Sequence, residues 1–165
     1  MSIDGVDFAI WEPVQEFPYK SSWSSHKFEK AGLRYEVGIC IQTGDCVWLH
    51  GPHRAGMDVD SVIFKNTLQH YLEPGEQCEG DGHYKKNVPD IFPARATRDE
   101  KNVSNRVRGR HEKFNGLLKN FDLLKNIFKY GIEKHAYAVR ACAVITQIRL
   151  ERSDIKVFQV FNYSY

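Results

Sequence analysis

The chain has 165 residues, of which 42% are hydrophobic and 27% charged, and its formal net charge is +2 at pH 7. This length and composition are typical of one globular domain with a core of its own, without internal repeats or low-complexity segments. No apolar run approaches the roughly 20 residues of a membrane span, and the start lacks a signal-peptide pattern. We therefore expect an intracellular protein with no membrane partner.

The first half of the chain is predicted to form strands. Alternating apolar and polar residues with β-branched enrichment predict three of them, separated by an irregular polar segment at 20–28. The second and third pair as a hairpin around a turn at 43–45, and Gly51-Pro52 ends the third. The predicted strands cover residues 2–11, 33–41 and 46–50.

The second half is predicted to be mostly helical. Asp60 has the position of the N-cap of a helix that ends before Pro74-Gly75. A short strand at 76–80 follows, and Asp81 comes directly after it. Residues 85–105 are interpreted as a loop with one brief strand at 88–92. Two long helices follow, and the second is expected to be well buried because it is rich in Ala, Val and Ile. These helices cover residues 103–129 and 132–150.

The order of these elements predicts a mixed α/β fold in which helices cover a small sheet. We assign residues 1–152 to one domain. Residues 153–165 are rich in aromatic side chains and are interpreted as a C-terminal tail, either an added strand or a frayed end.

Charge is distributed unevenly along the chain. Residues 1–84 carry 6 Lys/Arg and 13 Asp/Glu, whereas residues 85–140 carry 14 Lys/Arg and 6 Asp/Glu. Since lysine and arginine neutralise phosphates, the basic segment indicates either a nucleic-acid-binding face or an ordinary solvated helical surface. The cysteines form no CxxC pair and no zinc-like cluster, so we interpret them as reduced thiols without a metal or redox role. They are Cys40, Cys46, Cys78 and Cys142.

Three separate acidic motifs are candidates for a metal site, because carboxylate oxygens are the ligands that Mg²⁺ prefers. Asp4 and Asp81 could face each other if their strands are neighbours in the sheet. Glu112 lies almost opposite the apolar stripe of its helix, beside Arg108 and Asn115, so the helix core does not bury it. Taken singly, each aspartate equally suits a turn, and Glu112 equally suits a solvated surface.

These motifs belong to a longer pattern that resembles the DDE endonuclease domain of Harbinger-type transposases. The resemblance covers roughly residues 3–150, with its motifs in family order. The segments that carry it are Ile3-Asp-Gly-Val-Asp7, Ser25-His-Lys-Phe28, Leu33-Arg-Tyr-Glu-Val-Gly38, His50-Gly-Pro52, Asp60-Ser-Val-Ile-Phe64, the Asp81 motif, and Arg110-His-Glu112 followed by Asn115-Gly116 and Leu118-Lys119.

The resemblance implies a ribonuclease H-like fold and a nuclear, metal-dependent enzyme that cuts DNA. Its catalytic and metal-binding residues would be Asp4, Asp81 and Glu112, which would hold two Mg²⁺ ions, or Mn²⁺ in their place. Asp7 would lie near the site at best, and His111 suits packing better than a phosphate contact. Basic residues would hold the DNA backbone without reading bases: Arg106, Arg108, Arg110, Lys113 and Lys119.

Two departures from the family pattern qualify these expectations. Glycine and histidine are exchanged in the second motif, Asp81-Gly82-His83-Tyr84. The helix-turn-helix region that precedes the first aspartate in this family has no counterpart. We therefore expect a fragment that relies on a separate DNA-binding subunit or on a homo-oligomer. The alternatives are a catalytically inactive module that binds DNA or protein, and a generic ribonuclease H-like nuclease that acts on RNA or hybrids.

Overall fold

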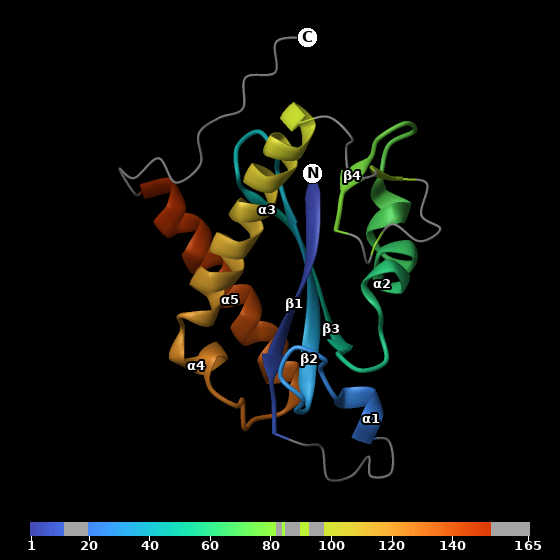
Figure 1. Cartoon of the computed structure of the whole chain (residues 1–165). Coiled ribbons are helices and arrows are strands. Elements are labelled where there is room, and N and C mark those ends of the chain that lie inside the picture. Colours follow the sequence, from blue (N-terminus) through green and yellow to red (C-terminus); the bar gives the residue numbers. More distant parts are fainter. Residues whose placement is uncertain (12–19, 82–83, 85–89, 93–97, 153–165) are drawn as a thin grey trace.

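The computed structural model describes residues 1–11, 20–81, 84, 90–92 and 98–152 (Figure 1). The predicted tail at 153–165 lies outside the described residues, as do residues 82–83 of the second acidic motif. In chain order the elements are β1 (Ser2–Ala9), α1 (Lys20–Trp23), β2 (Gly32–Ile39), β3 (Cys46–Arg54), α2 (Asp60–Asn66), the 3₁₀ helix η2 (Leu68–Tyr71), β4 (Cys78–Glu79), β5 (Ile91–Phe92), α3 (Arg98–Lys119), α4 (Asp122–Lys125) and α5 (Ile132–Arg152).

The central strand of the sheet is β1. Within the described residues the five strands lie in the order β3-β2-β1-β4-β5, with α3, α4 and α5 on one side and α2 on the other (Figure 1). β1 is antiparallel to β2 along its whole length, and it is parallel to β4 through the pair of Ser2 with Glu79. This arrangement confirms the predicted mixed α/β, ribonuclease H-like fold.

The predicted hairpin is present, but β3 continues through Gly51-Pro52 to Arg54. Glu36 pairs with His50 and Arg34 with His53, so β3 carries one residue more than β2 between these pairs. The extra residue makes a bulge in an edge strand, where a proline without an N–H donor is tolerated. The prediction that Gly51-Pro52 ends the strand was therefore wrong.

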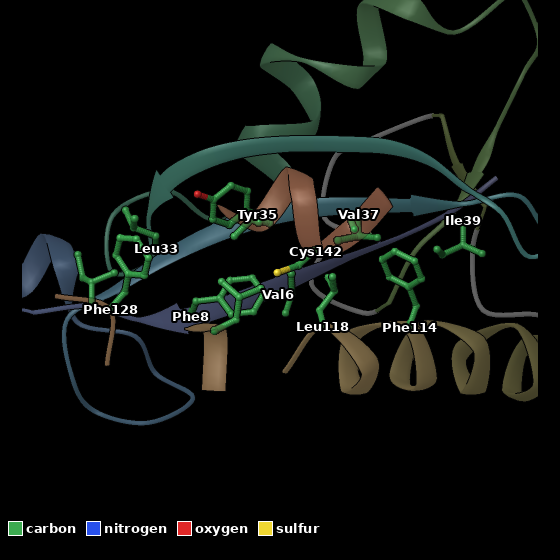
Figure 2. Packing of buried hydrophobic residues seen from close by; sticks show 14 of the residues in the cluster. Val6, Phe8, Leu33, Tyr35, Val37, Ile39, Phe114, Leu118, Phe128 and Cys142 are labelled. Atoms are coloured by element: carbon green, nitrogen blue, oxygen red, sulfur yellow. The ribbon is translucent and has the colours of Figure 1, made fainter. Parts of the chain in front are cut away.

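The main core lies between the sheet and helices α3, α4 and α5 (Figure 2). Strand alternation points one side of β1 and β2 toward these helices, where Phe114 and Leu118 of α3 are 0% exposed. Burying side chains of this size stabilises the fold by about 1.5–3 kcal/mol each, which holds α3 firmly against β1. The strand residues of this core are Val6, Phe8, Leu33, Tyr35, Val37 and Ile39.

The helices differ from their predicted limits and burial. The segment 20–28, expected to be irregular, begins with the single turn of α1. α3 starts at Arg98 and ends at Lys119, where a turn leads into α4. α5 buries only one side, since Tyr137 and Val144 are 70% and 59% exposed. Its apolar composition predicted full burial, but only the face turned to the sheet packs. Among the described residues, no helix has the length and apolar character to cross a membrane.

The side of the sheet covered by α2 buries a charged pair. Arg34 donates Nε to Asp7 Oδ1 at 2.8 Å and Nη2 to Asp7 Oδ2 at 2.9 Å, and Ser25 Oγ donates to Oδ2 at 2.6 Å. Burial alone would raise the pKa of Asp7, but the hydrogen bonds from Arg34 and Ser25 bring it below its ordinary value. Asp7 is therefore a charged anchor of the sheet in the folded protein.

Asp60 does not cap α2 as predicted. Val59 occupies the N-cap position, and no side chain makes the capping hydrogen bond. The Asp60 carboxylate packs instead on Gly5, where an added Cβ would lie 2.4 Å from Asp60 Oδ1. Arg34 Nη1 lies 3.4 Å from the same oxygen. A side chain at position 5 would therefore displace the Asp60 carboxylate from its place beside Arg34.

Glu36 makes the stability of the fold depend on pH. It is 1% exposed, and burial raises the pKa of its carboxyl from 4.5 to about 7, although Trp48 Nε1 donates to Oε2 at 3.0 Å. The folded state therefore binds more protons than the unfolded state between these values, and stability falls as pH rises through them. We expect Glu36 to contribute a fall of up to about 3 kcal/mol in the free energy of unfolding. His111 and His135 oppose it, because burial lowers their pKa values to about 4 and makes stability rise between pH 4 and 6.5.

Urea unfolding at pH 5 and pH 8 measures this effect, with Glu36→Gln as the reference. The variant should lack the contribution of Glu36, so its stability should fall less, or rise more, from pH 5 to pH 8, and it should be more stable than the wild type at pH 8. Equal pH dependence of the two proteins would contradict the assignment to Glu36.

Candidate active site

Asp4 lies on the α3 side of β1, opposite in alternation to Asp7. Asn115 of α3 donates Nδ2 to Asp4 Oδ2 at 3.1 Å, which ties the carboxylate to the helix. Burial raises the pKa of Asp4, the Lys27 ammonium lowers it in part, and the Asp81 carboxylate raises it further. Asp4 and Asp81 are therefore near enough to repel each other.

Asp81 follows the end of β4 after one residue, Gly80. Because Ser2 pairs with Glu79 in a parallel ladder, counting two residues along each strand brings Asp4 level with Asp81. The strands of the two aspartates are neighbours in the sheet, which was the condition for the two residues to face each other. Both residues are only partly buried, as residues exposed to a ligand must be.

Glu112 lies on the side of α3 that lines a pocket with the start of β1 and the end of β4. It is exposed, whereas Phe114 and Leu118 of the same helix are buried in the core. Residues just before and just after Glu112 join α3 to β1 by hydrogen bonds. Ser2 Oγ lies 2.7 Å from His111 Nε2, and Asn115 reaches Asp4. These two bonds fix where α3 presents Glu112 relative to Asp4.

His111 is 4% exposed, and burial lowers its pKa to about 4, so it is neutral at physiological pH. Its hydrogen bond to Ser2 makes it a packing residue at the border of the site. This agrees with the packing role expected for it, although its ring also lines the pocket.

The three acidic motifs meet at one pocket of about 70 Å³, called here the acidic pocket. Asp4, Asp81 and Glu112 all line it, although they are 77 and 31 residues apart in sequence. Its other walls are Ser2, Ile3, Glu79, Gly80, Ser104, Val107, Arg108 and His111.

The donor chemistry of the acidic pocket suits a hard divalent cation. All three motif residues offer carboxylate oxygens, and a cation would relieve the repulsion between Asp4 and Asp81. Within the described part of the chain, however, no three His, Cys, Asp or Glu side chains converge into a metal-ligating group. The backbone thus brings the donors to one pocket, and ion binding requires their side chains to turn inward.

Comparison with known proteins decides the family. The model of the DDE superfamily endonuclease family matches residues 3–147, which include all three acidic motifs. The chain belongs to this family. None of the curated proteins and none of the solved structures compared with the chain matches it. DDE endonucleases are transposase-type nucleases that act on DNA and generally use divalent metal ions.

The basic residues predicted to hold DNA are not equivalent in this DDE endonuclease. Arg106, Arg108, Lys113 and Lys119 are exposed on α3. Arg110 is buried at 6% exposure, and its Nη1 donates to the backbone oxygen of Ile41. The prediction of a DNA contact fails for Arg110, because its guanidinium points into the protein and supports the turn after β2.

Two residues near the site of the DDE endonuclease, Lys27 and Glu79, were not predicted as site residues from the sequence. Lys27 Nζ donates to the backbone oxygen of Gly5 at 2.5 Å and is the leading cation in the field of Asp4. Glu79 lines the acidic pocket because it pairs with Ser2. Lys27 lies in the Ser25-His-Lys-Phe28 segment of the family resemblance, but no periodicity places its side chain, so only the folded chain shows that it reaches the site.

Proposed function

We propose that this DDE endonuclease is a metal-dependent, Harbinger-type transposase nuclease whose site is formed by Asp4, Asp81 and Glu112. The observation that supports it is that carboxylates from three distant segments line one pocket beside exposed basic residues. The proposed ligands of two Mg²⁺ ions are these three side chains, with Mn²⁺ as a substitute. Action on DNA would take place in the nucleus.

The side chains around the acidic pocket have separate tasks in the proposed reaction. Asn115 holds the Asp4 carboxylate toward α3. Arg108 lines the pocket as an exposed cation and would bind an oxygen of the scissile phosphate. Divalent ions, when bound, activate a water molecule for attack and stabilise the leaving oxygen. The 3′-hydroxyl that cleavage liberates could then serve in strand transfer.

Contacts outside the pocket would hold the DNA backbone electrostatically. Arg106, Lys113 and Lys119 are exposed on the same helix as Glu112, so their ammonium and guanidinium groups can follow a strand that leads to the pocket. Such contacts position DNA without reading its sequence. We propose that target recognition depends on a partner, either a separate DNA-binding subunit or a second copy of the chain.

Nicking of supercoiled plasmid DNA tests the proposed function. The wild type should nick in Mg²⁺ or Mn²⁺ and not in chelator, and Glu112→Gln should abolish nicking because a ligand carboxylate is lost. Glu133→Gln removes the same charge from an exposed site at the start of α5 and should nick like the wild type. Equal nicking by Glu112→Gln and the wild type would overturn the proposal.

A catalytically inactive, DNA-binding module is the second candidate, favoured by the absence of a converged ligand group among the described residues. Calorimetric titration with Mn²⁺ separates the two. Heat of binding that depends on Asp81 supports the nuclease, whereas salt-sensitive DNA binding without any Mn²⁺ binding supports the module.

A further inference from the structure

A second pocket, of about 360 Å³, lies along β1 beyond the acidic pocket. It is called here the lysine pocket. It opens between the end of β1 and α4, which Figure 1 shows beside each other. Its lining combines lysine with aromatic and aliphatic side chains: Phe28, Lys30, Lys119, Leu124, Lys125 and Ile127.

The described residues that line the lysine pocket carry a positive charge that is largely uncompensated within the pocket. Lys30, Lys119 and Lys125 surround it, and Asp7, the one carboxylate among its described lining residues, is already paired with Arg34. Burial lowers the pKa of Lys119, and the neighbouring Lys27 ammonium lowers it further. A bound anion would relieve this crowding of cations.

The floor of the lysine pocket is apolar and partly aromatic. The Phe28 ring lies over Gly32, where an added Cβ would be 2.8 Å from the ring Cζ. Leu124 is 3% exposed, while Ile127 remains 40% exposed beside it. An aromatic and aliphatic floor with amines at the rim matches a ligand that combines a flat ring with a phosphate, because bases stack on aromatic rings and phosphates bind lysine.

The lysine pocket and the acidic pocket lie along the same edge of β1. Between Ile3 and Phe8 this edge pairs with no strand in the described ranges, and the chain at Phe128 closes it from Ala9 on. Lys27 stands between the two pockets, bonded to the Gly5 oxygen and acting on both Asp4 and Lys119.

Helix α3 connects the two pockets on its own side. Glu112 and Lys119 are seven residues apart, so they share a face and lie roughly 10 Å apart along the helix axis. Gly116 lies between them, and a Cβ added there would meet nothing within 4 Å. At this point of α3, no described side chain blocks the path from one pocket to the other.

We propose that the lysine pocket binds one unpaired nucleotide of the DNA strand next to the scissile phosphate. The base lies on Phe28, and the phosphate contacts Lys30, Lys119 and Lys125. This inference rests on the proposed nuclease function, because it takes the acidic pocket as the place of cleavage. An unpaired base is required since a base inside a duplex cannot reach the ring of Phe28.

Binding of a single-stranded oligonucleotide in the presence of chelator tests the lysine pocket without any cleavage. Fluorescence anisotropy should show that Phe28→Leu, which keeps an apolar side chain, weakens single-strand binding about 5- to 100-fold, as expected for one lost stacking contact. Duplex binding should change little. Lys125→Gln should reduce the slope of log K against log salt by about 0.7.

Lys134→Gln is the matched control, because it removes an exposed lysine of α5 that does not line the pocket. It should leave the slope and the affinity unchanged. Wild-type affinity in Phe28→Leu, or equal loss for single strands and duplex, would overturn the nucleotide site. Failure of divalent-dependent nicking alone would overturn the nuclease proposal, so the two failures are distinguishable.

Discussion

Replacing Asp4 with asparagine is expected to lower divalent-dependent DNA cleavage by at least about 10³-fold, since the loss of a ligand carboxylate removes several kcal/mol of metal-ion catalysis. The fold should be as stable as the wild type or more stable. Burial and the Asp81 carboxylate both disfavour the charged form of Asp4, and an asparagine oxygen can still accept the hydrogen bond from Asn115.

Initial nicking rates and urea unfolding, measured on the same preparation at pH 7, test both halves of this expectation. Asp45→Asn provides a control, since Asp45 lies in the turn before β3 and takes no part in the acidic pocket. Undiminished cleavage by Asp4→Asn, or a marked loss of stability, would contradict the role given to Asp4.

Replacing Arg34 with methionine is expected to destabilise the fold by about 3–5 kcal/mol, because Asp7 would be left as a buried carboxylate without its partner. Asp7 is 1% exposed, and both of its oxygens accept hydrogen bonds from Arg34. The pKa of Asp7 is lower in the folded protein than in the unfolded chain. The stabilisation is therefore complete at pH values above the unfolded-state pKa, and it is lost as the pH falls through the folded-state pKa.

A double-mutant cycle with Asp7→Leu measures the coupling, and denaturant unfolding provides each free energy. The double variant should be much less destabilised than the sum of the single variants. Arg149→Met, on the exposed side of α5, should have little effect. Additive losses would show that the pair does not act as a unit.

Features set by local periodicity were predictable from the sequence. The alternation in β1 and β2 placed both strands correctly, and the helical stripe that buries Phe114 and Leu118 correctly left Glu112 exposed. The order of the acidic motifs also identified the residues that share the acidic pocket.

Features decided by tertiary contacts were not predictable. Pro52 stays within β3 because an edge strand can bulge, and Asp60 gives up capping because its carboxylate packs on Gly5 near Arg34. Arg110 lies one turn before Phe114 on the buried stripe of α3, but only the fold supplies the Ile41 carbonyl that its guanidinium reaches. In each case a partner distant in sequence outweighs the local preference.

The proposed metal site is tested most directly by asking whether divalent ions bind in the acidic pocket. Anomalous scattering from crystals soaked in MnCl₂ locates Mn²⁺ without relying on activity. We expect two Mn²⁺ positions about 3.5–4 Å apart in the pocket lined by Asp4, Asp81 and Glu112. An acidic pocket without Mn²⁺, or Mn²⁺ bound only elsewhere on the protein, would contradict the proposed metal site.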